Sequence, residues 1–151
     1  MSRLEVVSQD LSLEEYRELA EFRHQIRCFL SVTENNAVQM GLQPETYLLL
    51  LAVQGLPEGA RPTLGELAQR MCVTREAVSG LMEQAVARME VSRSSAEGNE
   101  EWVKLTRTGR DLLRRMAILN RDELERTGPD LVRALQSVLK QRRRHRGVGV
   151  A

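Results

Sequence analysis

The strongest constraint on the fold is the stretch from Arg61 to Arg110, where two short helical patterns are separated by only three residues. Thr63 and Glu66 have capping-box spacing: the threonine oxygen accepts an N–H three residues on and the glutamate reaches back, so a helix should begin directly after Thr63. Thr74 is a second N-cap and predicts another helix to about Glu90. Two helices with so short a turn form a helix-turn-helix.

A change of periodicity follows the second helix. After Glu90 apolar and polar residues alternate, the run SSAEGNE interrupts the pattern, and a short extended run returns from Trp102 to Leu105. This indicates a hairpin with a loose tip, placed where a winged helix-turn-helix has its wing. Cys72 and Val73 fill the turn between the helices. The expected inner faces are Leu64, Leu67, Ala68 and Met71 in the first helix, and Ala77, Val78, Leu81, Met82, Ala85 and Val86 in the second.

Two helices are expected before this stretch. Apolar residues recur at three- and four-residue intervals from about Ser12 to about Met40, which is typical of a long amphipathic helix ended by Gly41. Pro44 opens a second helix at its first position, where its missing N–H costs nothing. That helix is apolar nearly all round, so we expect it to be the buried centre of the domain. A short strand at 61–63 leads into the helix-turn-helix.

Two further helices are expected after the hairpin. Thr106 caps a helix to about Arg126, and Gly128 and Pro129 mark its end and the start of a last helix. Residues 143–151 are expected to form a flexible basic tail.

At the other end of the chain, the amphipathic helix that begins at about Ser12 has about 28 residues and spans ~42 Å, longer than a domain of this size needs for its own core. Its excess apolar stripe predicts a partner.

Composition fits one ordered domain. The 151 residues are 42% hydrophobic, and the net charge of +1 divides into −5 for residues 1–60, +1 for 61–110 and +5 for 111–151. No segment has the pattern of a membrane span or a secretory signal, which predicts a cytoplasmic protein. Cys28 and Cys72 are far apart and have no histidine at metal spacing, so we expect reduced, buried thiols and neither metal nor cofactor.

The strings LQPETYLLLLAVQGLPEGARPTLGELAQRM and VKLTRTGRDLLRRM resemble, in order and spacing, the MarR family of bacterial transcriptional regulators over nearly the whole chain. The resemblance implies a mainly α, winged helix-turn-helix fold with long terminal dimerisation helices, in the order α-α-β-α-α-β-β-α-α. It implies one domain, with dimerisation helices at 12–40 and 107–142 and the winged module at 44–106. A homodimer places two recognition helices roughly 34 Å apart and predicts a palindromic operator in double-stranded DNA.

The helix from Arg75 to Glu90 is the one expected to read DNA. Arg75 is the candidate for a base contact, because arginine can donate two bonds to guanine; contact with phosphate or solvent is the alternative. Ser79 would reach a base or a phosphate, and Glu76 would accept from cytosine, orient Arg75 or stay solvated. Gln84 lies further along the same face. Phosphate contacts are expected around this helix from Arg61, Thr63, Thr74, Arg88, Arg93 and Arg107.

The wing departs from the family pattern. Many members carry an arginine near the tip that enters the minor groove, whereas Gly98 and Asn99 stand there in this chain. Asn99 is the expected tip contact, but the neighbouring carboxylates of Glu97, Glu100 and Glu101 repel phosphate. The wing is therefore held away, or the recognition helix does most of the reading, or DNA binding is weakened. Met89 replaces the usual glycine before the strand, which is costly only at positive φ.

Members of the family often sense small aromatic or phenolic anions in a cleft between the dimer helices and the winged module. The resemblance implies Arg23, His24, Arg27 and Tyr47 as its border; the alternatives are solvent-facing or dimer-edge charges, an interface histidine and a core tyrosine. Some relatives sense peroxide through a cysteine on the first helix. Cys28, with His24 one turn earlier, is the candidate here, and a buried, unreactive thiol is the alternative.

The expected function is a homodimeric repressor of a palindromic operator that a small ligand releases. Enzymatic function has no support, because no nucleophile, base and orienting acid can be placed together and no glycine-rich phosphate loop or metal cluster occurs. One rival is a winged-helix dimer with weakened DNA binding that acts through protein interaction, motivated by the acidic wing. The other is a repressor that senses peroxide through Cys28.

Overall fold

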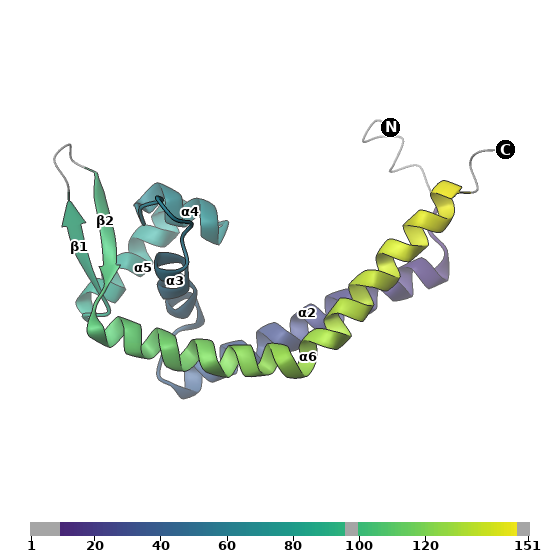
Figure 1. The fold of residues 1–151 in the computed structure, drawn as a ribbon, viewed down its shortest axis with the longest axis horizontal. Coiled ribbons are helices and arrows are strands. Elements are labelled where there is room, and N and C mark those ends of the chain that lie inside the picture. Colours follow the sequence, from purple (N-terminus) through teal and green to yellow (C-terminus); the bar gives the residue numbers. More distant parts are fainter. Residues whose placement is uncertain (1–9, 96–99, 148–151) are drawn as a thin grey trace. The chain divides into compact units, whose positions relative to one another are not determined.

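The computed structural model describes residues 10–95 and 100–147 (Figure 1). Its elements are α2 (Leu13–Gln39), α3 (Pro44–Gln54), α4 (Leu64–Met71), α5 (Arg75–Ala87), β1 (Val91–Ser95), β2 (Glu101–Leu105) and α6 (Arg107–Gly147). The expected mainly α, winged helix-turn-helix architecture is confirmed. Two compact units divide the chain: residues 33–121 form the winged unit, and the residues before and after them form the terminal unit. No helix in the described part is long and apolar enough to cross a membrane.

The core of the winged unit is built around α3, which packs against α4, α5 and β2. Leu49 and Leu50 of α3 are fully buried. The expectation that α3 is the buried centre of the domain is confirmed for one side of the helix, whereas Leu48 and Leu51 on its other side are 50% and 41% exposed. Its neighbours in this unit cover one side of the helix only. The buried apolar residues around it are Ala37, Leu42, Tyr47, Val53, Leu67, Ala68, Val78, Met82, Ala85, Val91, Val103, Leu105, Leu113 and Met116.

Three helices end in the same left-handed turn. Gly41 after α2, Cys72 after α4 and Met89 after α5 have φ values of 72°, 55° and 57°. In each turn the next residue's N–H donates to the carbonyl oxygen five residues earlier, over 2.9, 3.1 and 2.9 Å respectively, which is the Schellman pattern. The turn at Met89 ends α5 at Ala87 rather than at the expected Glu90. The turn at Cys72 leaves that thiol exposed rather than buried.

The wing is a two-stranded antiparallel hairpin. Its register runs from Val91 opposite Leu105 to Ser95 opposite Glu101. Val91, Val103 and Leu105 are buried and lie on one face of the hairpin, as alternation along a strand requires. The wing is therefore attached to the core through its base, where these three residues lie.

The short strand expected at 61–63 is reduced to a single bridge between Thr63 and Trp102. The Val103 N–H donates to the carbonyl oxygen of Pro62 over 3.2 Å. Pro62 has no N–H to return, and the Thr63 N–H donates to the carbonyl oxygen of Arg61 instead, over 2.8 Å. A longer ladder cannot form for these reasons.

The helix α6 is continuous through Gly128 and Pro129, where a break between two helices was expected. Proline removes one backbone hydrogen bond and commonly costs about 3 kcal/mol within a helix. Gly128 lessens the steric part of this cost, because the clash between a proline ring and the preceding residue involves a β-carbon that glycine lacks. The helix also includes residues 143–147, so the expectation of a flexible tail is wrong there; residues 148–151 lie outside the described part.

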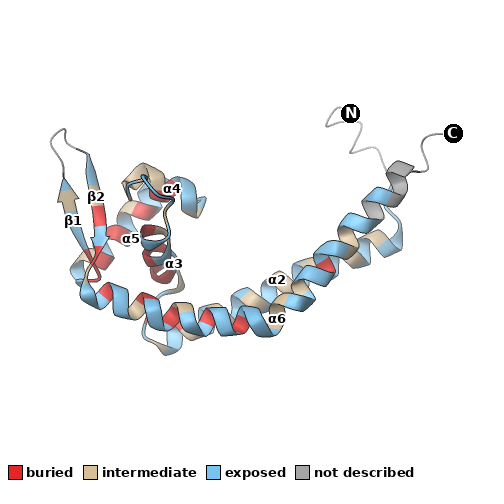
Figure 2. Cartoon of the chain, in the orientation of Figure 1, coloured by how far each residue is buried: buried red, intermediate tan, exposed pale blue. Residues whose placement is uncertain are grey.

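The terminal unit has little core of its own (Figure 2). Among residues 10–32 and 122–140, only Glu123 and Ala134 are buried. Cys28 is exposed in this unit, so the expectation of a buried thiol is wrong. Large apolar side chains are exposed on both helical segments: Leu13, Tyr16, Leu19 and Leu30 on α2, and Leu124, Val132, Leu135 and Leu139 on α6.

Candidate nucleic-acid interface

Threonine side chains cap both helices of the helix-turn-helix. Thr63 Oγ1 accepts from the N–H of Glu66 over 3.3 Å, and Thr74 Oγ1 accepts from the N–H of Ala77 over 3.2 Å. The reciprocal half of the expected capping box does not form, because the Thr63 N–H donates to the Arg61 carbonyl oxygen instead; the Glu66 carboxylate lies 3.8 Å from Arg70 Nε. Each cap uses one oxygen lone pair, which leaves the hydroxyl proton free for a phosphate.

The outward face of α5 is polar. Val78, Met82 and Ala85 are buried against the core, whereas Ser79 is half-buried. Ala77, which the sequence pattern placed on the inner face, is exposed because it lies in the first turn of the helix, before the buried stripe begins. Among the residues expected to meet DNA around this helix, the exposed ones are Thr74, Arg75, Glu76, Gln84, Arg88 and Arg107.

Arg75 lies against the first turn of α4. A β-carbon on Gly65 would stand 2.7 Å from Arg75 Nη2, so a side chain at this position would push the guanidinium away. The Arg75 side chain thereby bridges the two helices of the motif. Gly65 gave no signal in the sequence pattern, because its role depends on a contact between two helices.

Arg93 and Arg61 both have partners on the wing. Arg93 Nη1 is 3.1 Å from Glu101 Oε2, diagonally across the hairpin, so one wing carboxylate is neutralised within the chain. The Arg61 guanidinium lies over the Trp102 ring, 4.7 Å from its centroid. Exposed cation–π pairs of this kind contribute about 0.5–1 kcal/mol. Asn99, the expected tip contact, lies outside the described residues.

The junction between α5 and the wing contains a buried carboxyl group. The Glu90 side chain is 3% exposed, and its Oε2 has no hydrogen-bond partner in the described part of the chain. Burial raises the pKa of Glu90, and the positive charge of Arg88 opposes this shift. The Glu90 carbonyl oxygen accepts from the Thr106 N–H over 3.0 Å, and Thr106 Oγ1 donates to the Met89 carbonyl oxygen over 2.5 Å. The end of α5, the wing and the start of α6 are joined here.

The residues expected to border an effector cleft lie in different units. Arg23, His24 and Arg27 are exposed on α2 in the terminal unit. Tyr47 is 9% exposed and belongs to the core of the winged unit, which favours the alternative of a core tyrosine. The cleft itself stays a prediction. Cys28 Sγ is 3.5 Å from His24 Nε2, as the one-turn spacing predicted.

The fold of the chain is similar to the folds of several solved transcriptional regulators. The chain is similar to AbsC, a MarR family regulator from Streptomyces coelicolor, with a TM-score of 0.72 and 21% identity over 93% of this chain and 99% of that one. It is similar to BpsR of Bordetella bronchiseptica, whose DNA binding is regulated by 6-hydroxynicotinic acid. The TM-score is 0.61 and the identity 18%, over 79% of this chain and 92% of that one. It is also similar to the Mycobacterium tuberculosis regulator MOSR, solved in complex with DNA, with a TM-score of 0.55 and 23% identity over 69% of this chain and 78% of that one.

No protein-family model and no curated protein matches the chain. The similarity to the solved structures nevertheless extends over most of the chain, up to 93% of it for AbsC. The chain has the winged helix-turn-helix fold of MarR family regulators, and the expected fold is confirmed.

Proposed function

We propose that this protein is a homodimeric, DNA-binding transcriptional regulator that represses from a palindromic operator and is released by a small aromatic or phenolic ligand. The observation that carries the proposal is the helix-turn-helix itself. Two threonine-capped helix starts, at Thr63 and Thr74, lie beside an exposed polar face that begins at Arg75. Helix N-termini favour phosphate, and arginine favours guanine edges. MOSR, which has a similar fold, was solved with DNA bound.

The homodimer is supported by the terminal unit. Its large apolar side chains are exposed in a single chain, and burial of such area contributes roughly 25 cal/mol per Å². An extended apolar face of this kind on a monomer typically marks an interface. A two-fold partner would pair the same face with itself, which gives the two recognition helices the symmetry of a palindrome.

Release by a ligand is supported by BpsR, whose DNA binding 6-hydroxynicotinic acid regulates. The expected border residues Arg23, His24 and Arg27 are exposed cations or potential cations on one helix, as an anionic effector requires. Their participation is part of the proposal.

Two alternatives rest on specific observations. Arg93 forms an ion pair with Glu101, so its positive charge is not available for a phosphate. This favours a winged dimer with weakened DNA binding that acts through a protein partner. The proximity of His24 to the exposed Cys28 favours peroxide sensing. In that chemistry the thiolate attacks one peroxide oxygen, becomes a sulfenic acid and releases the other oxygen as water or an alcohol.

Two measurements test the proposal. Selection of bound fragments from genomic DNA, followed by gel shifts at low salt, should recover a palindromic site; no shift at low salt, where electrostatic attraction is strongest, contradicts DNA binding. Sedimentation of Leu135→Glu against the neighbouring exposed control Gln136→Glu tests the dimer. We expect only Leu135→Glu to sediment as a monomer, and equal behaviour of the two variants contradicts this interface.

A further inference from the structure

The side chain of Arg75, the first residue of α5, lies against the backbone of α4. The three atoms nearest to a β-carbon placed on Gly65 all belong to the Arg75 guanidinium: Nη2 at 2.7 Å, Cζ at 3.3 Å and Nε at 3.7 Å. The guanidinium group therefore lies across Gly65, in space that the side chain of any other residue would enter.

The backbone does not require a glycine at this position. Gly65 is the second residue of α4, and its φ is not in the left-handed region. Glycine is less favourable than alanine inside a helix, because it loses more conformational freedom on folding. The space that Arg75 occupies is therefore the structural reason for a glycine here.

No carboxylate places Arg75. Glu76 was one residue expected to orient it, but Arg75 forms no ion pair with any residue that the structure describes. Glu66, the neighbour of Gly65, lies 3.8 Å from Arg70 Nε instead. Packing on Gly65 therefore places the Arg75 guanidinium, and its N–H donors are available to DNA.

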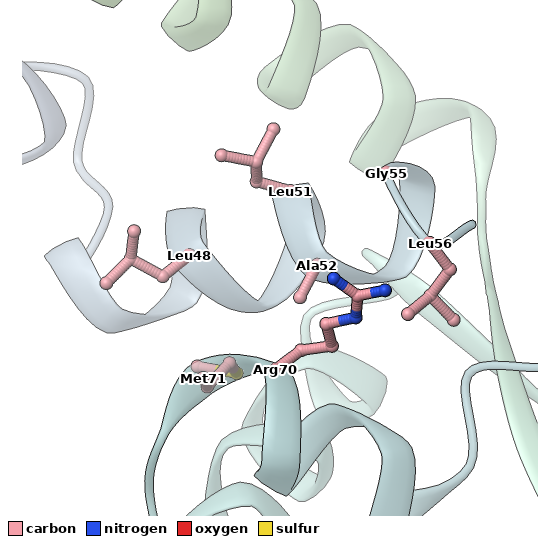
Figure 3. Close-up of a pocket in the computed structure, with 7 residues that line it drawn as sticks. All are labelled: Leu48, Leu51, Ala52, Gly55, Leu56, Arg70 and Met71. Carbon is pink, nitrogen blue, oxygen red and sulfur yellow. The ribbon is translucent and has the colours of Figure 1, made fainter.

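Arg70, near the other end of α4, has a different environment. Figure 3 shows its side chain extending toward Ala52 and Leu56, along a cavity of about 420 Å³ between α3 and α4. Its guanidinium thus lies beside α3 and not beside the starts of α4 and α5. Arg70 is therefore a suitable control, because it is an arginine of the same helix-turn-helix in a different place.

We propose that Gly65 is a positioning residue for operator recognition. Because it has no side chain, the Arg75 guanidinium can rest on the first turn of α4, beside the helix starts that Thr63 and Thr74 cap. A side chain that is already ordered loses less conformational freedom when it binds, which strengthens its contact with one particular base pair. This role rests on the proposed function.

A double-mutant cycle tests the role. The wild type, Gly65→Ala, Arg75→Ala and the double variant are titrated, at one salt concentration, with the palindromic site recovered by selection and with its single-base variants. We expect Gly65→Ala to reduce base preference by about three- to tenfold, at the same position as Arg75→Ala. In the Arg75→Ala background Gly65→Ala should change nothing, because no guanidinium remains to be displaced. Arg70→Gln should keep the wild-type preference.

The contact itself is measured without DNA. Nitrogen NMR relaxation of Arg75 Nε should show a more mobile side chain in Gly65→Ala than in the wild type. Thermal unfolding should show that Gly65→Ala is at least as stable as the wild type, because only the end of a flexible side chain must move and alanine favours the helix.

Three results would overturn the positioning role. Gly65→Ala could keep the wild-type base preference, or it could bind the operator more tightly, which would mean that α4 withholds the guanidinium from DNA. Its effect could also persist in the Arg75→Ala background, which would assign the effect to the α4 backbone. If the wild type binds no operator at low salt, the proposed function fails and the positioning role fails with it. If Arg75→Ala changes base preference and Gly65→Ala does not, only the positioning role fails.

Discussion

Gly109 lies against the backbone of Glu90, so closely that a β-carbon on Gly109 would stand 2.0 Å from the Glu90 carbonyl oxygen. The same oxygen accepts from the Thr106 N–H. The first turn of α6 thus packs directly on the junction between α5 and the wing. This explains why a glycine is required in the LTRTGR segment, three residues after the threonine whose hydroxyl accepts its N–H.

Gly109→Ala is expected to destabilise the protein by about 3 kcal/mol, because backbone rather than a flexible side chain must move to admit the methyl group. Gly80→Ala is the control: Gly80 lies inside α5 with nothing within 4 Å of the added carbon, and the variant should be stabilised by up to about 1 kcal/mol. Urea unfolding measures both. Similar free energies of unfolding for the two variants would refute the close contact.

Met89→Gly is expected to stabilise the protein by about 1 kcal/mol. Met89 has a φ of 57°, which costs a residue with a β-carbon roughly 1–2 kcal/mol, and its side chain is 72% exposed and so contributes little burial. Met89→Ala keeps the β-carbon and should leave stability nearly unchanged. If alanine and glycine at this position give equal thermal midpoints, the left-handed turn carries no strain.

Glu90→Gln is expected to stabilise the protein increasingly as the pH rises. Burial raises the pKa of Glu90 above its ordinary value of 4.5, so the protonated form is favoured by folding. That contribution is fully present below pH 4.5 and is lost as the pH rises through the raised pKa. The difference between variant and wild type should therefore be larger at pH 8 than at pH 4 in denaturant unfolding. The exposed Glu76→Gln is the control, and a pH-independent difference would contradict the shift.

Arg75→Ala is expected to weaken operator binding by about 1–3 kcal/mol and to relax preference at one base position. Arg88→Ala, as a phosphate contact, should weaken binding to all sequences alike and reduce the salt slope by about one. Competition assays with single-base operator variants distinguish the two. A uniform loss with Arg75→Ala would reassign that residue to phosphate.

Trp102 is a built-in reporter of the wing, because it is the only tryptophan in the chain. We expect its fluorescence to change when operator DNA is added, since Arg61 must leave the ring to meet a phosphate. The emission of the free Arg61→Gln variant should already differ from that of the free wild-type protein, and operator DNA should change the emission of the variant less than that of the wild type. An unchanged wild-type spectrum at saturating DNA would place Arg61 and this face of the wing clear of the duplex.

Local signals in the sequence determined the helix starts and the alternation of the hairpin. Thr63, Thr74 and Thr106 cap the helices expected of them, and Gly41 ends α2, because capping uses groups within three to five residues of one another. The break expected at Pro129 is absent. A proline removes one backbone hydrogen bond, but the hydrogen bonds of the helical turns on both sides oppose a break, and the residue pattern alone does not weigh these two effects against each other.

Only the tertiary structure decided which residues meet across the fold. The contact of Gly109 with Glu90, the place of Arg75 over Gly65 and the cavity beside Arg70 each join segments from different helices or from a helix and a turn. The end of α5 at Ala87 likewise depends on burying the Glu90 side chain after a left-handed turn that methionine does not favour. Sequence periodicity assigns a residue to a face, whereas packing between elements determines what that face touches.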